Sequence, residues 1–266
     1  MQSLIVGLPL PSASFDNHSF LAAPSFGEYQ QLVVDLASVS RAVDDIVHGT
    51  AAHTTYGGQA VVNGEASPHA FPLREILTMR RRETEWMLSH GGLIVVVASP
   101  GVPHADIAGD PWNSFDWLPE PDGFSFADDL LAGFGRPGAV LVDSEHPFAP
   151  IIQALAPRLA YRVYVNEEAR AVAETGHVFA RSEGGVPIAF DMRAGEGHLV
   201  FLPTILKPES DRPIIAQAML DSFERWNSRN SPPAPEPSKS DSVAGAFQPR
   251  LHDARPGTTP PEEVTQ

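Results

Sequence analysis

The sequence predicts an α/β fold, a three-layer sandwich built on a mainly parallel sheet with an antiparallel hairpin near its C-terminal end. The first observation behind this prediction is an amphipathic pattern over residues 72–90, which indicates a helix. Gly91 and Gly92 end the pattern, and the run LIVVVA at residues 93–98 follows at once. An unbroken β-branched run is typical of a central parallel strand that is covered on both faces. A helix, a glycine pair and a buried strand in succession indicate α/β architecture.

The second observation is a pair of apolar runs near the C-terminal end, at residues 186–191 and 198–202. The turn Gly195-Glu196-Gly197 joins the two runs, and Pro203 follows the second, as is common where a strand stops. A third run at residues 177–180 precedes them and is set off by a Ser-Glu-Gly-Gly turn. These runs predict the last segment of the sheet.

The predicted helix over residues 72–90 has an apolar side and a charged side. We expect the apolar side to face the core and the charged side to face water. An Arg-Arg-Arg run on this helix could bind an anionic partner, although a solvated helix face is the more ordinary interpretation. Expected on the buried side are Leu73, Ile76, Leu77, Trp86 and Leu88, and on the wet side Arg74, Arg80, Arg81, Arg82, Glu83 and Glu85.

The remaining elements follow from shorter patterns. Apolar runs predict strands, amphipathic runs predict helices, and Gly, Pro and polar clusters predict loops. We expect strands at 3–8, 29–36, 138–142 and 161–165, and helices at 39–48 (capped by Ser38 or Ser40), 124–133, 148–155 and 213–226. We expect a polar loop at 11–25, a loop or small hairpin at 49–70 and an aromatic loop at 110–123.

The length and the composition indicate one domain and a tail. The chain has 266 residues, of which 42% are apolar, which suits one sizeable core. We therefore predict a single α/β domain over residues 1–228. Residues 229–266 are rich in Pro and Ser with few large apolar residues, so we predict that this segment is disordered.

Charge and residue usage exclude several classes of protein. The net charge of −15 repels phosphate backbones and anionic lipid, which argues against nucleic-acid and membrane binding. The absence of cysteine removes disulfides, thiolate metal ligands and a Cys nucleophile. No apolar run approaches the roughly 20 residues of a membrane helix, and the first residues lack the features of a signal peptide. We expect a cytoplasmic protein.

Three segments carry a family resemblance: GGLIVVVASP at 91–100, FDWLP at 115–119 and VPIAFDMRAGEGHLVFLP at 186–203. They resemble class I glutamine-amidotransferase-like domains of flavodoxin-like fold, in particular the divergent members without amidotransferase chemistry, over residues 1–226. Active members of that family carry a Cys at a strand-to-helix elbow and a His-x-Glu pair further on. By order along the chain, the elbow falls near Ser99-Pro100-Gly101, which has no Cys, and no His-x-Glu follows the later strands. The resemblance therefore implies the fold and a binding role, without the glutaminase activity.

Candidate catalytic residues cluster after the predicted strand at 138–142. Asp143, Glu145 and His146 supply two carboxylates and an imidazole, which could bind a metal or relay a proton. The simpler interpretation is that Asp143 or Ser144 caps the following helix, with Glu145 in its first turn. His104 also follows a strand exit, close to two aspartates, but an ordinary loop residue is the simpler interpretation.

Two further candidates, Asp35 and Ser99, lie at the ends of predicted parallel strands. Open α/β sheets bind ligands at the carboxyl ends of their strands, so we expect both to contact a ligand. Ser99 is not expected to be a nucleophile because the Gly-x-Ser-x-Gly motif is absent. Pro100 also lacks the backbone N–H that an oxyanion hole uses.

The aromatic loop at 110–123 contains Trp112, Phe115 and Trp117. Aromatic side chains are enriched in ligand pockets and protein interfaces, so this loop is a candidate for partner binding. The same side chains could instead pack against the edge of their own domain. The sequence does not decide between these two roles.

These patterns favour a non-catalytic, amidotransferase-like binding or regulatory domain for an unknown protein partner or small ligand, with no cofactor and no metal. The alternative is a metal-dependent hydrolase that uses Asp143, Glu145 and His146 with His104 or Asp35. A third hypothesis is an assembly module in which the aromatic loop meets a second copy of the chain, so a homo-oligomer is possible.

Overall fold

The computed structural model describes most of the chain up to Asn230. The described residues are 2–47, 52–54, 60–62, 68–99, 105–107, 110–112, 114–132, 140–159, 161, 163–204 and 209–230. Residues 1–230 form one compact unit. The last helix, α5 (Arg212–Asn230), runs two residues beyond the predicted end of the domain at 228. The rest of the predicted disordered tail, residues 231–266, lies outside the described residues.

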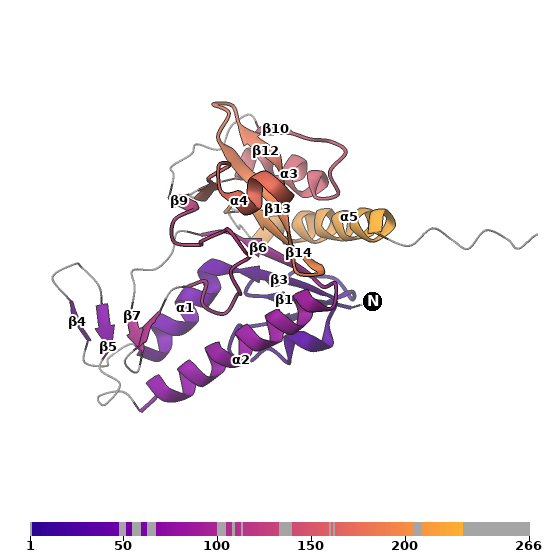
Figure 1. The fold of residues 1–266 in the computed structure, drawn as a ribbon. Helices are drawn as coiled ribbons and strands as arrows, with labels where there is room; N and C mark the ends of the chain where they lie inside the picture. Colours follow the sequence, from indigo (N-terminus) through magenta and orange to yellow (C-terminus); the bar gives the residue numbers. More distant parts are fainter. Residues whose placement is uncertain are drawn as a thin grey trace, which may run out of the picture. The chain divides into compact units, whose positions relative to one another are not determined.

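The described residues form a main sheet of eight strands in the order β10-β12-β13-β14-β6-β3-β1-β2 (Figure 1). The five strands from β14 to β2 are parallel, and β13, β12 and β10 continue the sheet in antiparallel fashion. The predicted mainly parallel sheet with a C-terminal antiparallel hairpin is confirmed. The bounds are β1 (Ser3–Val6), β2 (Phe15–His18), β3 (Gln31–Asp35), β6 (Leu93–Val97), β10 (Val140–Val142), β12 (Gly176–Ser182), β13 (Pro187–Ala194) and β14 (Gly197–Leu202).

Helices cover both faces of this sheet and complete three layers. Alternate residues along a strand point to opposite faces, so the fully buried strands β1, β3 and β6 feed two separate cores. One core joins Leu4, Val34 and Val96 to helices α1 (Leu36–Val47) and α2 (Ala70–Ser89). The other core joins the opposite faces of the same strands to α3 (Ala149–Leu155) and α5.

Smaller elements lie outside the main sheet. A second sheet has the order β4 (Ala52–Thr54), β5 (Ala60–Val62), β7 (Ala105–Ile107) and β8 (Asp110–Trp112), and β4 and β5 form the small hairpin that was one of two expectations for residues 49–70. The remaining elements are β9 (Leu130–Ala132), which pairs with β11 (Val163–Val165), helix α4 (Arg170–Thr175), and the 3₁₀ turns η1 (Phe26–Glu28), η2 (Ala156–Arg158) and η3 (Glu209–Asp211). Among the described helices, none combines the length and apolar character needed to cross a bilayer.

The two strongest local signals in the sequence correspond to well-formed structure. Gly91 has φ +78° after the last turn of α2, and the Gly92 and Gly91 amides donate to the carbonyls of Met87 and Leu88 at 2.9 and 3.4 Å. This arrangement is a Schellman cap, which ends the helix and directs the chain into β6. Gly195, with φ +61°, forms the two-residue turn that pairs Ala194 with Gly197 in the β13–β14 hairpin.

Two predicted elements were wrong, and a third, the loop predicted at 110–123, begins with strand β8. Residues 11–25 are not wholly loop, because they contain β2, a short edge strand with polar side chains. The carboxylate of Asp16 accepts hydrogen bonds from Tyr29 and from His18, which lowers the pKa of Asp16 and, through the Tyr29 contact, raises the pKa of that tyrosine to about 12. The described part of the helix predicted at 124–133, residues 124–132, forms turns and β9 instead of a helix. There the Ser125 amide donates to the carboxylate of Asp129 at 2.9 Å, a local bond that competes with helix formation.

The ends and faces of two helices also differ from expectation. Helix α1 begins at Leu36, so Ser38 and Ser40 lie inside it and do not cap it. On α2, Arg80 was expected in water but is 2% exposed, and Trp86 was expected in the core but is 49% exposed. Arg80 is buried because its guanidinium donates to the carbonyls of Ala23 and Pro24 and forms an ion pair with Glu83 at 2.8 Å.

Candidate functional site

Two polar residues, His177 and Asp191, lie side by side near one edge of the otherwise apolar main sheet. The register pairs His177 of β12 with Asp191 of β13, and Asp191 with Val200 of β14. The same row continues through Val95 and Val33, both of which are fully buried. Because paired residues share a face of the sheet, Asp191 and His177 lie on the face that α3 and α5 cover. The sheet therefore places a carboxylate and an imidazole side by side at the end of an apolar row.

His146 brings a second imidazole to Asp191. It follows the end of β10 and is 1% exposed, with its ring stacked on Phe179 of β12 at 3.8 Å between ring centroids. His146 Nε2 lies 3.4 Å from Asp191 Oδ1. This distance suits an ion pair, but neither atom has a hydrogen-bond partner among the described residues. Two buried polar atoms thus face each other across a gap that no hydrogen bond closes, an arrangement that is rare in proteins.

His177 lies between two carboxylates and is open to solvent. Its Nε2 is 3.2 Å from Asp143 Oδ2, and its Nδ1 is 4.0 Å from Asp191 Oδ1. The side chains of His177 and Asp143 are 47% and 39% exposed, whereas that of Asp191 is 15% exposed. Asp143 therefore orients the His177 ring from the outside, while the other ring nitrogen faces the buried carboxylate.

A third imidazole, His198 of β14, lies close to this group and packs against Trp226 of α5 at 5.0 Å between ring centroids. Its Nδ1 is buried without a hydrogen-bond partner among the described residues. Burial lowers the pKa of His198, and the nearby charge of Asp191 only partly offsets this effect. His198 is therefore neutral near pH 7 and adds no positive charge beside Asp191.

The distances in this cluster fit the ligand shell of a metal ion. One ligand atom from each of His146, His177 and Asp191 lies within 4.8 Å of the other two. Two ligands of a tetrahedral Zn²⁺ with bonds of about 2.0–2.1 Å lie about 3.3–3.4 Å apart. The 3.4 Å between His146 Nε2 and Asp191 Oδ1 has this value, and the 4.0 Å to His177 Nδ1 needs only a small movement of an exposed ring.

The hydrogen bonds around His177 and His146 decide which ring nitrogen of each residue is available to bind a metal. For His177, a proton on Nε2 donated to Asp143 leaves Nδ1 free to bind a metal, which is the usual carboxylate–histidine–metal arrangement. For His146, the Phe148 amide donates to Nδ1 at 3.2 Å, so the neutral ring carries its proton on Nε2. Binding a metal through Nε2 would therefore move this proton to Nδ1 and break the hydrogen bond from the Phe148 amide. Because a ligating imidazole has to be neutral, we expect metal binding to weaken as the pH falls.

The structure brings together two of the four predicted catalytic candidates. Asp143 and His146 belong to the cluster, with Asp143 behind His177. Glu145 does not join them. Its side chain is exposed and lines a separate hollow of about 800 Å³ along α5. His104 lies outside the described residues.

The prediction that Asp143 or Ser144 caps the following helix is wrong. Helix α3 begins at Ala149 and has no side-chain cap. The Asp143 side chain instead accepts the Glu145 amide at 3.0 Å in the turn before the helix. This turn directs His146 inward, since the His146 amide also donates to the Asp143 carbonyl at 3.2 Å.

The residues predicted at the strand exits occupy the expected places. Asp35 ends β3 and pairs in register with Val97, two residues before Ser99. Asp35 is 4% exposed and Ser99 is half-buried. The two residues follow neighbouring strands at the carboxyl edge of the parallel block, whereas His177 and Asp191 lie in the middle row of the sheet.

The aromatic loop packs inward where the structure describes its side chains. Phe115 is 5% exposed and Trp117 is 0% exposed, so neither can be reached by a partner. Trp117 contacts Phe20 and Phe26 edge to face, with ring centroids 5.9 and 6.4 Å apart. Phe115 and Trp117 therefore pack against their own domain, which is one of the two roles expected for this loop. Trp112 lies in β8, and its side chain is outside the described part of the structure.

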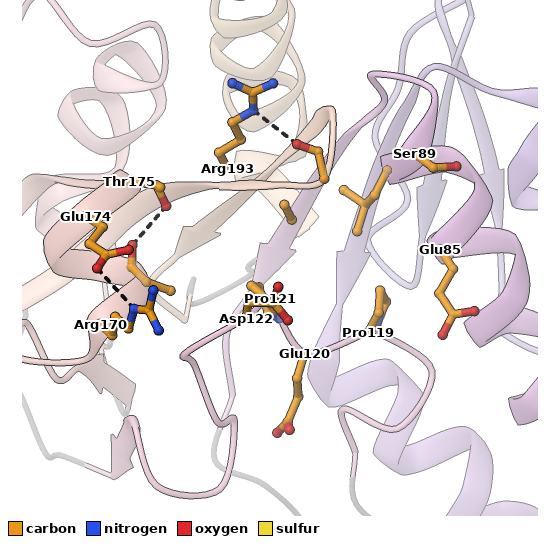
Figure 2. Close-up of a pocket in the computed structure, with 14 residues that line it drawn as sticks. Glu85, Ser89, Pro119, Glu120, Pro121, Asp122, Arg170, Glu174, Thr175 and Arg193 are labelled. Carbon is orange, nitrogen blue, oxygen red and sulfur yellow. Dashed lines mark hydrogen bonds and ion pairs between the residues drawn. The ribbon is translucent and has the colours of Figure 1, made fainter.

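A separate pocket of about 550 Å³ lies between α2, α4 and the residues that follow Pro119 (Figure 2). Figure 2 shows that its two arginines are engaged within the protein. Arg170 forms an ion pair with Glu174 at 3.0 Å, and Arg193 donates to the Gly195 carbonyl at 3.1 Å. The pocket contains none of the predicted site residues, and its mixed charges do not indicate a particular ligand.

Comparisons with known proteins do not identify a family. No protein-family model matches the chain, and no curated protein matches it. Among solved structures, the cytoplasmic protein STM3548 from Salmonella typhimurium is similar at a TM-score of 0.40 and 9% identity, covering 84% of this chain and 98% of its own. The cytoplasmic protein STM1381 from Salmonella typhimurium LT2 is similar at a TM-score of 0.40 and 12% identity, covering 85% of this chain and 96% of its own.

Proposed function

We propose that the protein is a metal-dependent hydrolase that binds one divalent transition-metal ion, with Zn²⁺ the best match, on His146, His177 and Asp191. The observation that carries the proposal is the buried Asp191 Oδ1, which makes no hydrogen bond among the described residues although it lies 3.4 and 4.0 Å from two imidazole nitrogens. Imidazole and carboxylate are preferred ligands of Zn²⁺, and a buried carboxylate oxygen that makes no hydrogen bond is costly.

The number and exposure of the ligands support a hydrolytic role. Catalytic zinc sites supply three protein ligands and leave a fourth position for water, whereas structural sites are closed by four. The cluster offers three ligands, and the 47% exposure of His177 gives solvent and substrate a route to the fourth position. A metal ion in such a site lowers the pKa of its bound water and produces a nucleophile at neutral pH.

Metal binding tests the proposal directly. We expect protein stripped with EDTA to bind one Zn²⁺ per chain in a calorimetric titration, and His177→Ala and Asp191→Asn to weaken binding at least about 100-fold. At a free Zn²⁺ concentration 100 times the Kd, the unfolding free energy should rise by about 2.7 kcal/mol. Asp143→Asn removes the carboxylate charge beside His177 and keeps an oxygen that can accept the Glu145 amide, and it should cost about 10–100-fold in affinity.

His90→Ala is the matched control, because His90 is an exposed histidine on a distant helix end and its loss should leave Zn²⁺ affinity unchanged. Zn²⁺ affinity retained in both His177→Ala and Asp191→Asn would refute the site. Binding without metal-dependent cleavage of p-nitrophenyl esters or phosphodiesters would retain the site and refute the hydrolase.

A second candidate is a non-catalytic, amidotransferase-like binding domain of the cytoplasm. The parallel block β2-β1-β3-β6-β14 supports it, because flavodoxin-like sheets have their first three strands in this order, with ligands at the carboxyl edge. Asp35 and Ser99 lie at that edge, and the sequence has no cysteine to act as nucleophile. If this candidate is correct, incubating the protein with L-glutamine should release no more ammonia than a protein-free blank. Measurable glutaminase activity would exclude it.

A further inference from the structure

Helix α2 carries an exposed stripe on the side opposite its buried face. At 100° per residue, Phe71, Glu75, Thr78, Met79, Arg82 and Trp86 fall within an arc of roughly 100°, and the buried residues from Leu73 to Leu88 fall on the other side. Phe71, Met79 and Trp86 are 59%, 44% and 49% exposed. Three large apolar side chains along one exposed helix face indicate an interaction surface rather than scattered surface residues.

We propose that this stripe binds the same stripe of a second copy of the chain, with the two α2 helices antiparallel. The order of residues along the stripe is self-complementary about a two-fold axis between Thr78 and Met79. In this register Phe71 lies opposite the second copy's Trp86, and Glu75 lies opposite the second copy's Arg82. A two-fold dimer repeats each of these contacts, as an isologous interface requires.

The charges on the stripe select a second copy over an unrelated partner. Within the described residues, neither Glu75 nor Arg82 has an ion-pair or hydrogen-bond partner. An acidic partner would satisfy Arg82 and repel Glu75, and a basic partner would do the reverse. Only a partner with the opposite charge at each of the two positions satisfies both, and an antiparallel copy of α2 has this pattern.

A hollow of about 620 Å³ lies along the same helix face and provides room for the partner's side chains. Its lining is drawn from α2 alone and includes Phe71, Glu75, Met79 and Arg82. The dimer would leave the His146–His177–Asp191 cluster open, because α2 and α1 cover one face of the sheet and this cluster belongs to the other face. The inference is therefore independent of the proposed metal site.

Sedimentation equilibrium of the full chain tests the dimer. The interface is small, so we expect a Kd in the micromolar range, visible between about 1 and 500 µM protein. Glu75→Arg places two arginines opposite each other at two symmetric positions, and Arg82→Glu does the same with two glutamates. Each should weaken the dimer at least about 10-fold. The double variant Glu75→Arg/Arg82→Glu restores opposite charges and should recover the affinity to within about 3-fold.

Arg225→Glu is the control, since it reverses an exposed charge on α5 and should leave the dimer unchanged. All the variants change exposed side chains, and their melting temperatures should stay within a few degrees of the parent. A monomer at every concentration would overturn the inference. So would a dimer that both single reversals leave intact, or a folded double variant that remains as weak as the single variants.

Discussion

Replacing Trp117 with alanine lowers the free energy of unfolding by about 3–5 kcal/mol, the range for removing a large aromatic side chain from a packed core. The Trp117 side chain has no exposed surface. On the α2 side of the sheet it packs against Phe20 and Phe26, which lie between β2 and β3. Its indole Nε1 also donates to the Ser114 carbonyl at 2.9 Å. Alanine leaves a cavity and an unpaired carbonyl, and the surrounding rings can fill the cavity only in part.

Urea unfolding followed by circular dichroism measures this loss. Trp86→Ala is the matched control, because Trp86 is 49% exposed and its loss should cost less than about 1 kcal/mol in dilute, monomeric protein. Similar losses for the two tryptophans would contradict the core position of Trp117. The comparison also separates the two roles that the sequence left open for the aromatic loop.

Replacing Arg80 with leucine is expected to cost about 3–5 kcal/mol, even though leucine has high helix propensity. Arg80 is 2% exposed, its guanidinium lies 4.3 Å from the centre of the Phe26 ring, and it neutralises Glu83, which is itself 14% exposed. Leucine would leave the carboxylate of Glu83 and the carbonyls of Ala23 and Pro24 without these donors. Leaving such groups unpaired is more costly than losing the ion pair alone.

Arg81→Leu provides the comparison for Arg80, because Arg81 is the next residue on the same helix and its side chain is 47% exposed beside Glu85. An exposed pair of this kind contributes little, so we expect a change of no more than about 0.5 kcal/mol in unfolding free energy. Equal effects at the two positions in a urea titration would show that Arg80 does not hold the loop through buried contacts.

The parts of the fold that follow from contiguous patterns could be predicted from the sequence. The helix that ends at Gly91 and the hairpin around Gly195 combine an apolar period with a glycine at a position of positive φ, so the local signals agree. Arg80 shows the limit of this reasoning. A helical period assigns a charged residue to water, whereas its position depends on loop carbonyls more than fifty residues earlier in the chain.

Two of the four residues of the candidate metal site could also be predicted from the sequence. Asp143 and His146 follow a strand, where functional side chains often lie, and they were recognised for that reason. His177 and Asp191 were not recognised, because each lies within a strand and their pairing depends on register. The β12–β13 register also shifts between Val178 and Ala180 and shifts back between Ala180 and Arg181, an irregularity that no local sequence pattern indicates. A slip of one residue moves a side chain to the opposite face.

The row that Asp191 shares with Val200, Val95 and Val33 has a consequence for engineering this protein. Any branched aliphatic residue at position 191 would extend the apolar row and remove a buried charge. A library selected for thermal tolerance in metal-free medium should therefore enrich apolar residues at this position. If Asp191 binds a metal as proposed, the most heat-resistant variants would have lost this ligand, so selection for stability and selection for metal binding would favour different residues at position 191.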